Sequence, residues 1–161
     1  MPSSCTGDFG ELDSLIASLN EIAGDKSELA GKLAAATVDL VREGFDLQCA
    51  PDGTPWPQSK AAQRRGGLTL VETEALKKNW LPESTPQTFG VVNDLPYARI
   101  HNFGWDPTWS HPPPWLPARA MVPETGELLS GTHELPPRWS ERFDAVTKKW
   151  LDSKLPAKPA V

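Results

Sequence analysis

The distribution of proline restricts where this chain can form long helices. Of its 17 prolines, about twice the usual share, only Pro2 precedes Ala50. Proline lacks a backbone N–H and breaks the interior of a helix. Long helices are therefore expected before Ala50 and after the Pro136-Pro137 pair, with short elements and extended chain between them.

Two helices are predicted in the first quarter of the chain, separated at Gly24. We expect the first to bury one apolar stripe and the second, longer helix to continue an apolar face. The stripe is formed by Leu12, Leu15, Ile16, Leu19, Ile22 and Ala23, and the longer face by Leu29, Leu33, Val38, Leu40, Val41 and Phe45. Asp8 with Glu11, and Asp25 with Glu28, have the spacing of capping boxes and mark the two helix starts.

Short elements are predicted in the middle of the chain. Phe89–Val92 is the best strand candidate because the Asn93-Asp94 turn follows it. Leu68–Val71 and Leu116–Val122 are further candidate strands. Short helical segments are expected at 72–80 and at 97–103, and the polar run 60–65, which Gly66-Gly67 ends, is expected to be either helix or loop.

A third strong helix is predicted to start at Pro136-Pro137. One face of it carries Trp139, Phe143, Val146, Trp150 and Leu151. The predicted fold class is α+β, with an N-terminal helical pair, a small central sheet of short strands and a C-terminal amphipathic helix. Residues 1–155 are expected to form a single domain, and residues 156–161 a flexible C-terminal tail.

The charge and the cysteines exclude several classes of protein. A net charge of −5 and a pI of about 5.2 argue against a protein that coats DNA, which needs a basic surface. Cys5 and Cys49 have no CxxC spacing, so neither a zinc knuckle nor a redox pair is indicated. No secretory signal or membrane-spanning stretch is visible, and the chain is expected to be made and kept in the cytosol.

No motif indicates catalysis, a metal site or a cofactor. His101, His111 and His133 lie 10 and 22 residues apart, which matches no helical metal pair. The sequence has neither a GxSxG elbow nor a glycine-rich phosphate loop. A metal-dependent hydrolase that uses the three histidines is kept as an alternative, to be decided by metal analysis of the pure protein.

Tryptophan is the other conspicuous residue, with 7 Trp against 1 Tyr. Trp80, Trp139 and Trp150 occupy helical positions that are expected to face the core. The remaining candidates for partner contact, Trp105, Trp109 and Trp115, lie in a segment with five prolines. Because Trp is enriched in interface hot spots, these three either contact a partner or pack locally.

A series of motifs in the middle of the chain resembles the virion morphogenesis, or tail completion, family of Mu-like and P2-like tailed phages. In order, these are Phe45, Pro51-Asp52-Gly53 with Trp56-Pro57, Leu68, Thr73-Glu74-Ala75-Leu76, the run Tyr97-Ala98-Arg99-Ile100-His101-Asn102-Phe103-Gly104, and Leu116-Pro117-Ala118-Arg119-Ala120-Met121. The resemblance covers roughly 44–122. Glu74 stands where the family pattern has glycine, and Ala120-Met121 stand where it has Pro-Phe.

The resemblance implies a non-enzymatic virion protein without a cofactor. Such a subunit would form a closed ring, expected to be hexameric, at the head–tail junction or neck, where it completes the tail and joins the head. Its expected partners are further copies of itself, the tail tube protein and the head connector or adaptor protein, with DNA passing through the lumen without specific binding and no contact with a membrane. It would be assembled in the host cytoplasm and remain in the virion. A head-side connector ring and, more weakly, a DNA-binding packaging accessory are the alternatives.

Seven residues are candidates for contacts between subunits or with partners: Trp56, Tyr97, His101, Trp105, Trp109, Trp115 and Arg119. Tyr97 and His101, four residues apart, are expected to face the same side of a helical turn. Arg119 is expected to pair with an acidic neighbour. Two interpretations remain open for four of them, Trp56, Tyr97, His101 and Arg119: they either maintain the fold of the subunit or contact another subunit directly.

Overall fold

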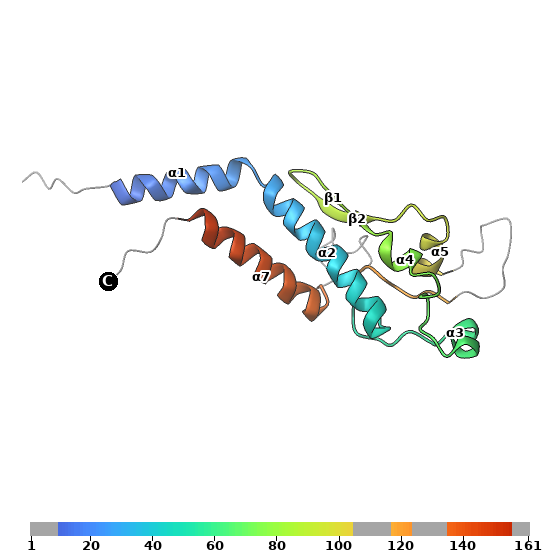
Figure 1. The fold of residues 1–161 in the computed structure, drawn as a ribbon. Coiled ribbons are helices and arrows are strands. Elements are labelled where there is room, and N and C mark those ends of the chain that lie inside the picture. The colour runs from blue at the N-terminus through green and yellow to red at the C-terminus, as the bar shows by residue number, and fades with distance from the viewer. Residues whose placement is uncertain (1–9, 105–116, 124–134, 156–161) are drawn as a thin grey trace, which may run out of the picture.

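The computed structural model describes residues 10–104, 117–123 and 135–155. Its elements, in chain order, are α1 (Gly10–Gly24), α2 (Ser27–Leu47), α3 (Lys60–Arg65), α4 (Ala75–Lys78), β1 (Leu81–Ser84), β2 (Phe89–Val92), α5 (Ala98–Phe103) and α7 (Pro137–Lys154). Figure 1 shows an elongated molecule with α1 at one end and α3 at the other. The predicted α+β class is confirmed.

Helix α2 is the central element, and β1, β2, α4 and α7 all pack against it. At its start the Asp25 carboxylate accepts a hydrogen bond from the backbone N–H of Ser27 at 2.8 Å. At its end Gln48 takes a left-handed conformation, with φ 55°, and its N–H bonds to the carbonyl of Gly44. The interior of the helix is rich in alanine and leucine, which favour helix, so local preference and burial agree.

The described sheet is a single antiparallel pair of strands, in which Leu81 lies opposite Val92 and Ser84 opposite Phe89. The predicted strand Phe89–Val92 is confirmed. Its partner β1 was not predicted, because Pro82 is unusual in a strand and is tolerated only at an edge or bulge.

The predicted strand Leu68–Val71 is wrong. This segment is a turn, with Leu70 at φ 62°. The backbone N–H of Thr69 donates to the side-chain oxygen of Gln48 at 2.6 Å, and the Thr69 carbonyl accepts from the same amide group at 3.1 Å. The Gln48 side chain therefore takes the place of a neighbouring strand.

The predicted strand Leu116–Val122 is also wrong over its described part, 117–122, which is irregular. The side-chain oxygen of Asn102 accepts from the backbone N–H groups of Met121 and Val122, at 2.7 and 3.2 Å. The segment is thus held by a side chain from α5, and its backbone groups need no neighbouring strand.

The hydrophobic core lies around the second half of α2. Phe45 is fully buried and meets Trp56 edge to face, with ring centroids 5.3 Å apart. Trp80, Trp139 and Trp150 are buried as predicted. Two ion pairs join α7 to α2. The Nη2 atoms of Arg138 and Arg142 lie 3.2 and 2.7 Å from the carboxylate oxygens of Glu43.

The predicted N-terminal helical pair is confirmed, but the burial of α1 differs from the prediction. Leu15, Ile16 and Leu19 are 37%, 46% and 49% exposed, so the expectation of a buried stripe is wrong. Figure 1 shows the cause: α1 projects beyond the start of α2, away from the core. The C-terminal end of α7 lies near the junction of α1 and α2. There the Nζ atom of Lys154 is 3.9 Å from a carboxylate oxygen of Glu21 and 3.1 Å from one of Glu28. No helix among the described ranges is long and apolar enough to cross a membrane.

Candidate functional site

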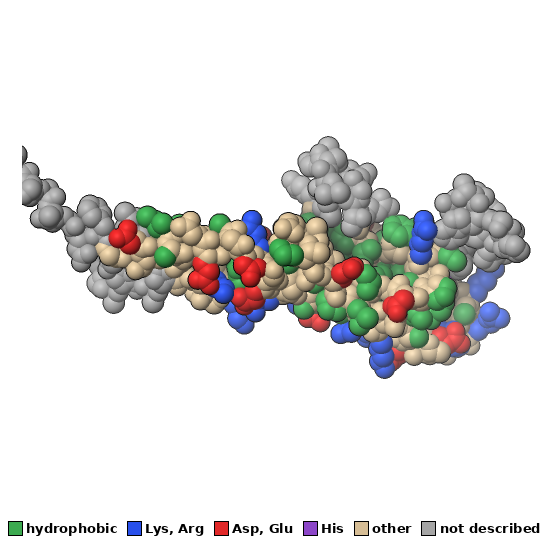
Figure 2. Space-filling model, turned by 90° about the horizontal axis from the view of Figure 1, so that it is seen from above, with side chains coloured by type: hydrophobic (Ala, Val, Ile, Leu, Met, Phe, Trp, Pro, Cys, Tyr) green, Lys and Arg blue, Asp and Glu red, His purple; other side chains and the backbone are tan. Residues whose placement is uncertain are grey.

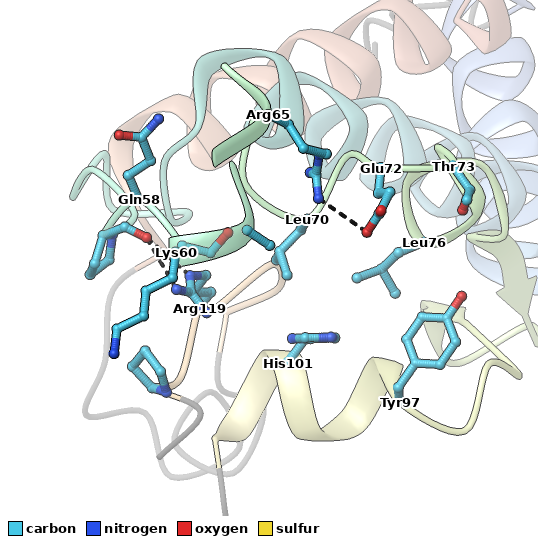
Figure 3. Close-up of a pocket in the computed structure, with 14 residues that line it drawn as sticks. Gln58, Lys60, Arg65, Leu70, Glu72, Thr73, Leu76, Tyr97, His101 and Arg119 are labelled. Atoms are coloured by element: carbon cyan, nitrogen blue, oxygen red, sulfur yellow. Dashed lines mark hydrogen bonds and ion pairs between the residues drawn. The ribbon is translucent and has the colours of Figure 1, made fainter. Parts of the chain in front are cut away.

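A groove of about 940 Å³ lies between α5 and the segment that leads into α3 (Figure 3). Three of the seven residues predicted from the sequence, Tyr97, His101 and Arg119, line this groove. The other lining residues are Pro57, Gln58, Ser59, Lys60, Ala61, Arg65, Leu70, Glu72, Thr73, Leu76 and Pro117.

Tyr97 and His101 come from successive turns at α5 and face the same side, as predicted. Their rings meet edge to face with centroids 6.0 Å apart. The Nδ1 atom of His101 is buried and has no hydrogen-bond partner among the described residues. Burial, and secondarily the charge of Arg119, lower the pKa of His101 below its ordinary value. The imidazole is therefore neutral at pH 7 and adds no charge to the groove.

Arg119 is a buried cation, 4% exposed, which ties the groove walls together. Its Nε and Nη2 atoms both donate to the carbonyl of Pro57 at 3.2 Å, and its backbone N–H donates to the carbonyl of His101 at 2.8 Å. The predicted pairing with an acidic side chain is wrong among the described residues, because Arg119 bonds to a backbone carbonyl instead. Burial lowers the pKa of Arg119, but a guanidinium stays charged at neutral pH.

The end of α5 fixes the position of the segment 117–122, which carries Arg119. Gly104 has φ 78° and ψ −172°, a conformation nearly confined to glycine. A Cβ atom there would lie 3.0 Å from the backbone nitrogen of Ala118. Together with Asn102, this close approach holds the segment that carries Arg119. The sequence pattern contained both residues, but nothing in it indicated that they act on a segment 14 or more residues away.

The rim of the groove is basic on the α3 side. Ser59 caps α3 by accepting a hydrogen bond from the N–H of Ala62 at 3.1 Å, and Ala62 is fully buried against the body. This fixes Lys60, which is exposed, at the first position of the helix. Arg65 pairs with Glu72 at 3.1 Å, on the side of the groove that faces Tyr97 and His101 (Figure 3).

Of the four predicted tryptophans, only Trp56 lies within the described residues, and it does not line this groove. Trp56 is buried in the core, where its Nε1 donates to the carbonyl of Ala120 at 3.2 Å. Burial leaves little of its side chain to touch another molecule. Trp105, Trp109 and Trp115 lie outside the described residues.

The groove has the composition of a binding surface. Leu70 and the Tyr97 ring offer apolar contacts over the buried Leu76, and Lys60 adds positive charge at the rim. Within the described ranges no group of His, Cys, Asp or Glu is arranged to hold a metal ion. His111 and His133, which the alternative hydrolase would need, lie outside those ranges.

The fold and this groove define a small α+β protein built around one long helix, with a groove at the end opposite its projecting helix. The sequence profile of the phage virion morphogenesis family matches residues 8–130, which is most of the chain. The protein therefore belongs to the phage virion morphogenesis family, as the motifs predicted. No curated protein and no solved structure matches this chain.

Proposed function

We propose that the protein is a tail completion, or terminator, subunit that forms a closed ring at the head–tail junction of a tailed phage. It acts as a structural component of the virion and has no enzymatic role. Membership of the virion morphogenesis family supports a part in building the particle. The observation that carries the more specific proposal is the unburied apolar stripe of α1, since it leaves the free subunit with a surface suited to a partner.

The energy available from this stripe is large enough to matter for assembly. Complete burial of a Leu or Ile side chain contributes about 1.5–3 kcal/mol. Leu15, Ile16 and Leu19 are still between 37% and 49% exposed. Burying the rest would contribute roughly 2–4 kcal/mol per contact, and a closed ring repeats that contact at every junction between subunits.

The charge of the chain suits a ring around DNA. The net charge of −5 disfavours tight non-specific binding of nucleic acid. DNA would therefore pass through the lumen without being held. In this proposal the ring is hexameric and contacts the tail tube protein on one side and the head connector protein on the other.

Three measurements test the proposed function. Light scattering on the purified protein should give the mass of a closed ring, and cryo-EM of intact necks should show that ring between tail tube and connector. Imaging and immunodetection of separated heads and tails should find the protein on tails. Its presence on isolated heads alone would instead support a head-side connector ring. A protein that stays monomeric at all concentrations and is absent from virions would contradict both.

A further inference from the structure

We propose that α1 of one subunit docks in the groove of the next subunit. This inference rests on the proposed ring, and it names the two surfaces that form each junction between copies. Closed rings of identical subunits need two different surfaces on each copy, one donor and one acceptor. An amphipathic helix bound in an apolar groove is a recurrent way to form such a contact.

The donor is the outer face of α1. Leu15, Ile16 and Leu19 lie at helical spacing on one side, and all three are exposed. Asp13, also exposed, lies one turn before Ile16 at the margin of this stripe. The helix contains no Lys or Arg, so the charged side chain beside its apolar stripe is that of Asp13.

The acceptor is the groove between α5 and α3. Its accessible apolar side chains, the half-buried Leu70 and the exposed Tyr97, can receive the leucine and isoleucine side chains of the donor. On its α3 side the exposed Lys60 supplies positive charge, whereas Arg65 is paired with Glu72. The charge of the acceptor rim thus complements the charge of the donor helix.

The position of the two surfaces makes a second copy the occupant. Figure 1 shows α1 and α3 at opposite ends of the molecule, with the full length of α2 between them. Figure 2 shows that the outer part of the projecting end carries acidic side chains, whereas the other end carries Lys and Arg side chains together with Asp and Glu. A subunit therefore cannot fill its own groove with its own α1, whereas a neighbour placed end to end brings the apolar stripe and Asp13 of its α1 to Lys60 and the apolar side chains of the groove.

A complementation experiment tests this assignment in the full-length protein. The donor variant carries Leu15→Ser and Leu19→Ser, and the acceptor variant carries Lys60→Glu and Tyr97→Ala. Each variant alone should associate at least about tenfold more weakly than wild type, as measured by light scattering and sedimentation. An equimolar mixture should form a one-to-one dimer, because the intact groove of the donor variant accepts the intact α1 of the acceptor variant.

Matched controls lie on the same helices but away from the contact. Ala17→Ser is on the opposite side of α1, and Gln63→Glu adds the same kind of charge to α3 outside the groove. Both should form rings as wild type does. Circular dichroism of every variant checks that the fold is retained. If the acceptor variant fails to fold, charge reversal replaces it: Asp13→Lys should weaken assembly, and Asp13→Lys mixed with Lys60→Glu should restore it.

The outcomes separate this inference from the proposed function. If wild type forms rings and the acceptor variant does too, while the donor variant does not, α1 docks elsewhere, for example on the exposed Leu81 and Val92 of the sheet, and the groove assignment is wrong. If both variants form rings, neither surface is the junction. If wild type itself never associates, the ring proposal fails with it.

Discussion

Replacement of Gly104 by alanine should destabilise the protein more than the same replacement at Gly66 or Gly90. At φ 78° and ψ −172° the Gly104 backbone lies in a region almost confined to glycine, and another residue there costs about 1–3 kcal/mol. The new Cβ would also lie 3.0 Å from the nitrogen and 3.3 Å from the Cα of Ala118. Because these are backbone atoms, the segment must shift, and overpacking of this kind costs about 1–3 kcal/mol.

The two effects together predict a loss of about 2–6 kcal/mol in the free energy of unfolding. Urea unfolding followed by tryptophan fluorescence measures it. With a denaturant slope of about 2 kcal/mol per molar, a loss of about 3 kcal/mol moves the midpoint down by about 1.5 M.

The two comparison glycines separate the causes. Gly66, which ends α3 at φ 64°, has no atom within 4 Å of an added Cβ, so Gly66→Ala should cost only the left-handed backbone conformation, about 1–2 kcal/mol. Gly90 in β2 has neither a positive φ nor a close neighbour, and Gly90→Ala should change stability by less than about 1 kcal/mol. If Gly104→Ala proves no more damaging than Gly66→Ala, the contact with Ala118 does not constrain the fold.

Two further predictions concern individual residues. Glu74 has φ 58°, so Glu74→Gly should raise the free energy of unfolding by about 0.5–1 kcal/mol because the left-handed strain is removed. The control, Glu83→Gly in β1, should lower the free energy of unfolding. A loss of stability at both positions would refute the reasoning. Burial and Arg119 lower the pKa of His101 in the folded state, so the unfolded chain binds the proton more tightly. Stability should be complete above the ordinary histidine pKa of about 6.5 and fall as the pH drops through it. Urea titrations of wild type and His101→Gln between about pH 5 and 8 check this: the variant should lose part of that slope, and identical slopes would contradict the predicted effect.

The sequence predicted those parts of the fold that depend on local periodicity. Helix α2, the strand Phe89–Val92 and the C-terminal helix α7 follow from apolar spacing and from turn or proline signals near their ends. The motif run also identified Tyr97 and His101 as neighbours on one face, because a spacing of four residues places two side chains together on a helix.

The parts that were missed depend on contacts between distant segments. Leu68–Val71 and 117–122 have the composition of strands, but the side chains of Gln48 and Asn102 satisfy their backbone groups. The pairing of Arg119 with the Pro57 carbonyl joins residues 62 positions apart. No local pattern encodes such a contact.

The periodicity of α1 was interpreted correctly as a helix and wrongly as a buried one. An apolar stripe shows that a helix has a face to cover, but it does not show whether the same chain or another molecule covers it. At Glu74 the sequence showed a departure from the family pattern, which has glycine there, but it did not show the reason. The structure supplies it: the backbone at this position is left-handed, a conformation that glycine adopts most easily.

The isolation of α1 from the core has a consequence for the timing of assembly. A 15-residue helix is only marginally stable in water when nothing packs against it, and Glu21 near its C-terminus opposes the helix dipole. Its amide hydrogens should therefore exchange with solvent quickly in the free subunit and become protected when α1 docks. The cost of ordering this helix would then reduce the net binding free energy of each junction. Early contacts would remain reversible, and misplaced copies could dissociate before the ring closes.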